Sequence, residues 1–93
     1  MDSKVLRLPN GLKGVGNLWF SGSDIEKVII PNSVESLGES AFSECKQIHE
    51  IIFEPGSCLK SIGDCCFAGS GLREIIIPKS ISSIGKSAFH NCA

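Results

Sequence analysis

The sequence predicts a curved α/β solenoid of about four coils, each built from a short parallel strand and a short helix. A glycine recurs at steps of 22, 25 and 22 residues, a phenylalanine follows it by four residues, and prolines keep nearly the same period. A fixed period of this length is typical of stacked repeat units. The glycines are Gly16, Gly38, Gly63 and Gly85, the phenylalanines Phe20, Phe42, Phe67 and Phe89, and the prolines Pro9, Pro31, Pro55 and Pro78.

Each unit is expected to begin with a short strand, because apolar residues alternate before the proline. Val28 and Ile30 show this spacing in the second unit, and Ile75 and Ile77 show it in the fourth. A period of two is strand spacing. Proline has no amide proton to donate to a ladder, so we expect each strand to end there.

A helix of one or two turns is predicted after each strand. In the second unit Ala41 and Phe42 are followed three residues later by Cys45, and this spacing places all three on one helical face. The recurring glycines are interpreted as corner residues at which the chain turns. The two extra residues of the third unit are assigned to a looser corner at 54–58, where Pro55 and Gly56 favour a turn.

Stacking of the coils must supply the core, because one coil cannot bury its own apolar face. Like residues should then lie in rows at the spacing of paired strands, roughly 4.8 Å. Trp19 stands in a row of otherwise small residues and fits only where no coil precedes it, so the first unit is interpreted as a terminal cap. The predicted core rows are Leu6, Val28, Ile51, Ile75; Leu8, Ile30, Phe53, Ile77; Val15, Leu37, Ile62, Ile84; and the four phenylalanines.

Length and composition predict one domain, 1–93. The chain is 42% hydrophobic and too short for two cores. We divide it into a degenerate cap-like unit, 1–24, and repeats at 25–47, 48–71 and 72–93, the last of them incomplete. A formal net charge of -1 gives no basic excess for nucleic-acid binding. No stretch has the length of a signal peptide or of a membrane span, so we expect no membrane insertion.

Catalysis, a cofactor and a bound metal are not expected. The five cysteines are odd in number and irregularly spaced, which favours free thiols packed as small apolar groups. A metal set would have to gather Cys65, Cys66, His90 and Cys92, and that pattern does not match the ligand pairs of zinc sites. The isolated glycines do not form a phosphate-binding loop.

The best candidate for a binding site is the face of the strands that points away from the core. If Val28 points inward, alternation turns its neighbours outward, and stacking aligns them with the equivalent residues of the next coils. A row of isoleucines beside a charged row is typical of a contact surface, although isoleucine could stand there for strand propensity alone. The predicted partner-binding residues are Lys27, Ile29, Glu50, Ile52, Glu74 and Ile76.

The last repeat stops before a further strand, so an open C-terminal edge is expected, through which the chain could associate with another copy. Two functions therefore stay open. One is a module that binds a protein or glycoprotein partner through the strand face. The other is a structural spacer, or a self-associating fragment of a longer array.

The units 25–47, 48–71 and 72–93 resemble the BspA-like class of leucine-rich repeats. Their shared motif is apolar-x-x-Ile-x-Ile-Pro-x-x-Val-x-x-Ile-Gly-x-x-Ala-Phe-x-x-Cys, and the departures are Ser70 in place of the Cys and Cys66 in place of the Ala. The resemblance implies a curved solenoid used for adhesion or other protein contact, with no catalysis. Because this class is abundant in large surface proteins of bacteria and parasitic protists, it also implies a cell-surface or secreted location.

Overall fold

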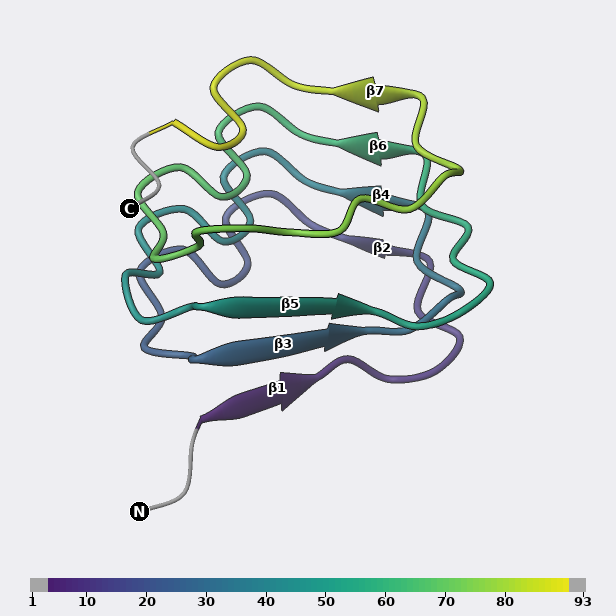
Figure 1. The fold of residues 1–93 in the computed structure, drawn as a ribbon, viewed down its shortest axis with the longest axis horizontal. Helices are drawn as coiled ribbons and strands as arrows, with labels where there is room; N and C mark the ends of the chain where they lie inside the picture. The colour runs from purple at the N-terminus through teal and green to yellow at the C-terminus, as the bar shows by residue number, and fades with distance from the viewer. Residues whose placement is uncertain (1–3, 91–93) are drawn as a thin grey trace.

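The computed structural model describes residues 4–90, which form a parallel-strand solenoid of about four turns (Figure 1). Two parallel sheets run along the stack, one with the order β1-β3-β5 and the other with the order β2-β4-β6-β7. The strands are β1 (Val5–Arg7), β2 (Gly14–Val15), β3 (Lys27–Ile30), β4 (Ser36–Leu37), β5 (Glu50–Phe53), β6 (Ser61–Ile62) and β7 (Ser83–Ile84).

The first sheet confirms the predicted register over three coils. Leu6 pairs with Val28, and Val28 pairs with Ile51, so one predicted core row is a ladder of inward side chains. Val28 is fully buried and Ile51 nearly so. The fourth member, Ile75, does not continue the strand ladder, because 74–78 has no strand conformation, but its side chain is partly buried against the core as predicted.

The second sheet was not predicted as a sheet. Its strands contain only two residues each, too few for alternation to be visible in the sequence. Its inward row is nevertheless one of the predicted rows, because Val15 pairs with Leu37, Leu37 with Ile62, and Ile62 with Ile84. Ile84 is 46% exposed at the end of the described stack.

The predicted short helices are wrong: within 4–90 the chain contains turns in their place. The N–H of Ser43 bonds the carbonyl of Ser40 within the coil, whereas the N–H of Phe42 bonds the carbonyl of Cys66 in the next coil, at 2.8 Å. A helix would direct both donors along its own axis. The residue two after each recurring glycine is also left-handed, which no helix accommodates; these residues are Leu18, Ser40, Cys65 and Ser87, with φ of 64°, 56°, 56° and 57°.

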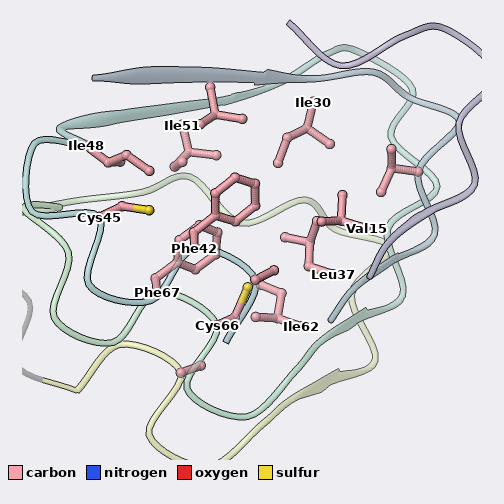
Figure 2. Close-up of a cluster of buried hydrophobic side chains, with 14 of the residues drawn as sticks. Val15, Ile30, Leu37, Phe42, Cys45, Ile48, Ile51, Ile62, Cys66 and Phe67 are labelled. Carbon is pink, nitrogen blue, oxygen red and sulfur yellow. The ribbon is translucent and has the colours of Figure 1, made fainter. Parts of the chain in front are cut away.

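The predicted phenylalanine row is confirmed as a continuous stack through the core. Phe42 and Phe67 are fully buried, with ring centroids 5.4 Å apart and planes within 5°. Figure 2 shows these two rings lying together among Ile30, Leu37 and other apolar side chains. Phe20 and Phe89 extend the stack at 5.4 and 5.6 Å and are only half-buried, because each has a stacked ring on one side alone.

Trp19 lies on the side of the first coil that a preceding coil would cover. Its side chain is 55% exposed and contacts Phe20 edge-on, with the centroids 6.3 Å apart. A Cβ added to Gly16 would collide with the indole ring. The indole therefore covers Gly16 on the side where, in later coils, the backbone of the preceding coil covers the equivalent glycine.

The recurring glycines are needed for close contact between coils, not for turn conformation as the sequence suggested. None of the four has a positive φ. A Cβ on Gly63 would lie 2.7 Å from the carbonyl carbon of Gly38 and 2.7 Å from the amide nitrogen of Glu39. Any side chain at this position would force neighbouring backbones apart.

We expect Gly63→Ala to lower the free energy of unfolding by about 1–3 kcal/mol, the usual cost of overpacking. Gly14→Ala is the matched control, because the nearest atom to its added Cβ is the Ser36 hydroxyl, at 3.0 Å, which can rotate away. Urea unfolding followed by circular dichroism compares the two. Equal midpoints for the two variants would show that the coils can separate without cost.

The two extra residues of the third unit lie in the corner to which they were assigned. Residues 54–60 connect β5 to β6, whereas 31–35 connect β3 to β4. Gly56 has φ +78°, a conformation that favours glycine. This longer corner borders the region where the first sheet ends.

Candidate functional site

The outward face of the first sheet brings together four of the six predicted partner-binding residues. Lys27 pairs with Glu50 and Ile29 pairs with Ile52, so one charged pair and one apolar pair lie side by side on β3 and β5. Ile29 and Ile52 are partly exposed, while Val28, between Lys27 and Ile29 on β3, points into the core. Alternation on a stacked strand is what holds these side chains in line.

Two ion pairs border this outward face. Lys27 Nζ lies 3.6 Å from Glu50 Oε1, and Arg7 Nη1 lies 3.9 Å from Glu54 Oε2. All four groups contact solvent, so each pair contributes roughly 0–1 kcal/mol to stability. Their main effect is to surround the two isoleucines with charge of both signs.

Glu74 and Ile76 do not join this face, contrary to the prediction of a row of three isoleucines. They belong to a segment, 73–79, which we call the strap, and the side chain of Ile76 is 87% exposed. In Figure 1 the strap runs across the stack in the same direction as β5, apart from the three paired strands.

Both ends of the strap are fixed to the third coil. On one side Leu72 is buried, and Gly71 packs so tightly that an added Cβ would lie 2.8 Å from the carbonyl oxygen of Ile48. On the other side the hydroxyl of Ser80 donates to the carbonyl of Leu59 at 2.6 Å. The strap is therefore held away from β5 only along its middle.

A groove of about 960 Å³ separates β5 from the strap. Sequence reasoning missed it, because the strap has the same alternating pattern as the paired strands. One signal was available: continuing the register would place Glu74 beside Glu50, and like charges directly opposed destabilise a strand pair. The groove is lined by His49, Glu50, Ile51, Ile52, Phe53, Glu54, Pro55, Gly56, Ser57, Glu74, Ile75, Ile76, Pro78, Lys79 and Ser80.

The thiols of the core are packing groups. Cys45 donates its thiol hydrogen to the carbonyl of Phe20 at 3.0 Å, and burial raises its pKa. Burial also raises the pKa of the Cys66 thiol, to about 12. Both thiols are therefore protonated at neutral pH and are poor nucleophiles. The four cysteines in the described part of the chain are free, and Cys92 lies outside it.

The remaining candidate groups are dispersed. Within residues 4–90 no three metal-ligating side chains gather, and the metal set weighed from the sequence includes Cys92, which is not described. His49 is exposed, with Nδ1 3.3 Å from the carbonyl oxygen of Gln47. No helix in the described range has the length and hydropathy to cross a membrane.

Similar folds occur in solved structures of bacterial proteins. The crystal structure of the pneumococcal vaccine antigen PcpA has a TM-score of 0.84 and 25% identity over 94% of this chain, which corresponds to 25% of PcpA. The leucine-rich repeat protein TpLRR of T. pallidum has a TM-score of 0.70 and 25% identity over 98% of this chain, corresponding to 56% of TpLRR. This chain therefore spans about a quarter and about half of these two proteins.

A leucine-rich repeat protein from Bacteroides capillosus ATCC 29799 shares the fold alone, with 16% identity and a TM-score of 0.54 over 92% of this chain and 78% of that protein. No curated protein matches the sequence. The family described as "BspA type Leucine rich repeat region (6 copies)" matches residues 2–93. With its glycine and phenylalanine rows stacked in register and its family match covering almost every residue, the chain belongs to the BspA-type leucine-rich repeat family.

Proposed function

We propose that this chain is a non-catalytic interaction module, which binds a protein or glycoprotein partner through the outward face of the first sheet and serves in adhesion. The observation that carries the proposal is the pairing of Ile29 with Ile52 beside Lys27 and Glu50. An apolar centre with a charged border is the usual composition of a protein contact surface. A hydrogen-bonded ladder also fixes this surface before binding, which limits the entropy lost on association.

We also propose a cell-surface or secreted location for the protein that contains this chain. PcpA is a pneumococcal vaccine antigen, and a vaccine antigen must be accessible to antibodies. The fold shared with PcpA supports the same kind of exposure here. Accessibility of an epitope tag to antibody on intact cells, compared with permeabilised cells, tests this location.

Replacing Ile29 and Ile52 together with serine is expected to weaken partner binding at least tenfold, or by about 1.4 kcal/mol. The fold should remain, because both side chains point away from the core. A photocrosslinking residue at position 52 identifies the partner, and surface plasmon resonance with the purified partner then measures the dissociation constant.

The matched control is Leu18→Asn. Leu18 is also exposed, at 63%, but lies in a turn with φ 64°, a conformation that asparagine tolerates. This variant should bind like the parent. If the double variant binds as well as the parent does, the outward isoleucines serve strand formation alone.

A structural spacer or self-associating fragment is the second candidate, favoured by the exposed strand edges of the stack. Among the described strands, β1 and β5 end the first sheet, and β2 and β7 end the second. Unpaired edges are sites of association. Sedimentation velocity over a range of concentrations separates the two functions: self-association that the double variant Ile29→Ser/Ile52→Ser retains would favour the spacer.

A further inference from the structure

We propose that the groove between β5 and the strap binds an extended peptide segment of a partner protein, inserted as an additional β-strand with a lysine or arginine between Glu50 and Glu74. The inference extends the proposed interaction function from the outward face to a backbone edge, and rests on that function only for the existence of a protein partner. Three features of the groove support it: an unpaired strand edge, an excess of acidic groups, and an apolar lining.

Among the strands of residues 4–90, none pairs with the edge of β5 that faces the groove. β5 pairs with β3, and no backbone hydrogen bond of the described residues joins 72–78 to β5. The third and fourth coils, to which β5 and the strap belong, are joined elsewhere by backbone hydrogen bonds. The Gly85 N–H bonds the Ile62 carbonyl at 2.7 Å, and the Phe67 N–H bonds the Ala88 carbonyl at 2.8 Å. The gap is therefore local, and its donors and acceptors can bind an added strand.

The charged groups of the groove favour a basic ligand, because the carboxylates of Glu50, Glu54 and Glu74 outnumber the single ammonium group, that of Lys79. Glu50 has Lys27 on one side, at 3.6 Å, and faces the groove on the other. Glu74 has no ion pair among the described residues. Direct closure of the strap in register would oppose these two carboxylates, whereas a lysine or arginine between them attracts both. The same lysine or arginine would continue the alternation of positive and negative charge across neighbouring strands, which begins with Lys27 on β3 and Glu50 on β5.

The apolar lining of the groove indicates which other residues the bound segment should contain. Ile51 and Phe53 on β5 and Ile75 on the strap lie along the groove, and Phe53 and Ile75 are only partly buried. An inserted strand would place apolar residues one and three positions after its basic residue among these side chains. The volume of about 960 Å³ is sufficient for a short extended segment.

The segment at 27–30 has this pattern, with Lys27 followed by Val28 and Ile30, and it already occupies the equivalent place in the sheet. In a folded second copy, β3 is paired on both edges with β1 and β5, so it is not free to insert. A partner protein with an exposed extended segment is therefore the occupant that we infer.

The test uses a fluorescent synthetic peptide of the 25–32 sequence, Ile-Glu-Lys-Val-Ile-Ile-Pro-Asn, and the full chain, with binding measured by anisotropy. We expect saturable binding, and binding at least about tenfold weaker when glutamate replaces the lysine of the peptide. The variant Glu74→Lys should reverse this preference: it should bind the lysine peptide about tenfold more weakly than the parent does and bind the glutamate peptide better than the parent does. Glu74 is exposed, so the substitution should leave the fold intact.

Two controls separate this site from the outward face. Ile29→Ser changes the outward face but not the groove lining, so it should leave peptide binding unchanged. The same variant is expected to weaken binding of a partner to the outward face. Hydrogen exchange should show slower exchange at 50–54 when the peptide is bound. Three results would each overturn the inference: equal binding of the lysine and glutamate peptides, weaker binding of both peptides by Glu74→Lys, or unchanged hydrogen exchange at 50–54 when the peptide is added. None of these results would contradict binding at the outward face.

Discussion

Phe42→Ala is expected to lower the free energy of unfolding by about 3–5 kcal/mol, the usual cost of deleting a buried phenyl ring. The ring is fully buried and stacked on both sides, with centroids 5.4 Å from those of Phe20 and Phe67. The loss leaves a cavity that the rigid backbone of adjacent coils cannot close. This loss is a large fraction of the about 5–15 kcal/mol that a small domain has in total, so the variant should unfold at a much lower urea concentration than the parent.

Phe89→Ala is the matched control. Its ring stacks on Phe67 at 5.6 Å but is only partly buried, so the same deletion should cost clearly less. Urea unfolding followed by circular dichroism gives both free energies. Losses of similar size in the two variants would contradict a stack whose strength depends on enclosure from both sides.

The second large effect is alkaline destabilisation through Cys66. Its thiol has an ordinary pKa of 9.0, which burial raises to about 12 in the folded chain. Above about pH 9 the unfolded chain gains a thiolate while the folded chain keeps its proton, so stability is complete below pH 9 and falls as pH rises towards 12. At about 1.4 kcal/mol per pH unit, this group accounts for a loss of up to about 4 kcal/mol.

Cys66→Ala should remove that part of the pH dependence. Alanine fits the position, because Ala41 and Ala88 occupy the same row in the neighbouring coils and are buried there. Urea unfolding at about pH 8 and about pH 11, in the presence of a reductant, measures the difference. Cys58→Ala is the control, since Cys58 is exposed; an equal pH dependence in all three proteins would show that the Cys66 thiolate is tolerated in the core.

The sequence predicts the candidate site correctly on β3 and β5 but not on the strap. Lys27, Ile29, Glu50 and Ile52 lie together as alternation and period require. The same reasoning fails for Glu74 and Ile76, which have the same local pattern. Alternation within a segment identifies which side chains can share a face. The repulsion between Glu74 and Glu50 depends on both residues being adjacent, so the pattern of either segment alone does not predict it.

The sequence by itself determined the repeat, its register and the rows of the core, because residues at equal positions of a stacked array must contact one another. Leu6, Val28 and Ile51, and the four phenylalanines, needed no other information. Tertiary structure decided what a single coil cannot specify. The N–H of Phe42 bonds the next coil, which excludes a helix, and Gly63 must lack a side chain because the backbone of the preceding coil lies against it. The strap lies across a groove from β5 instead of pairing with it.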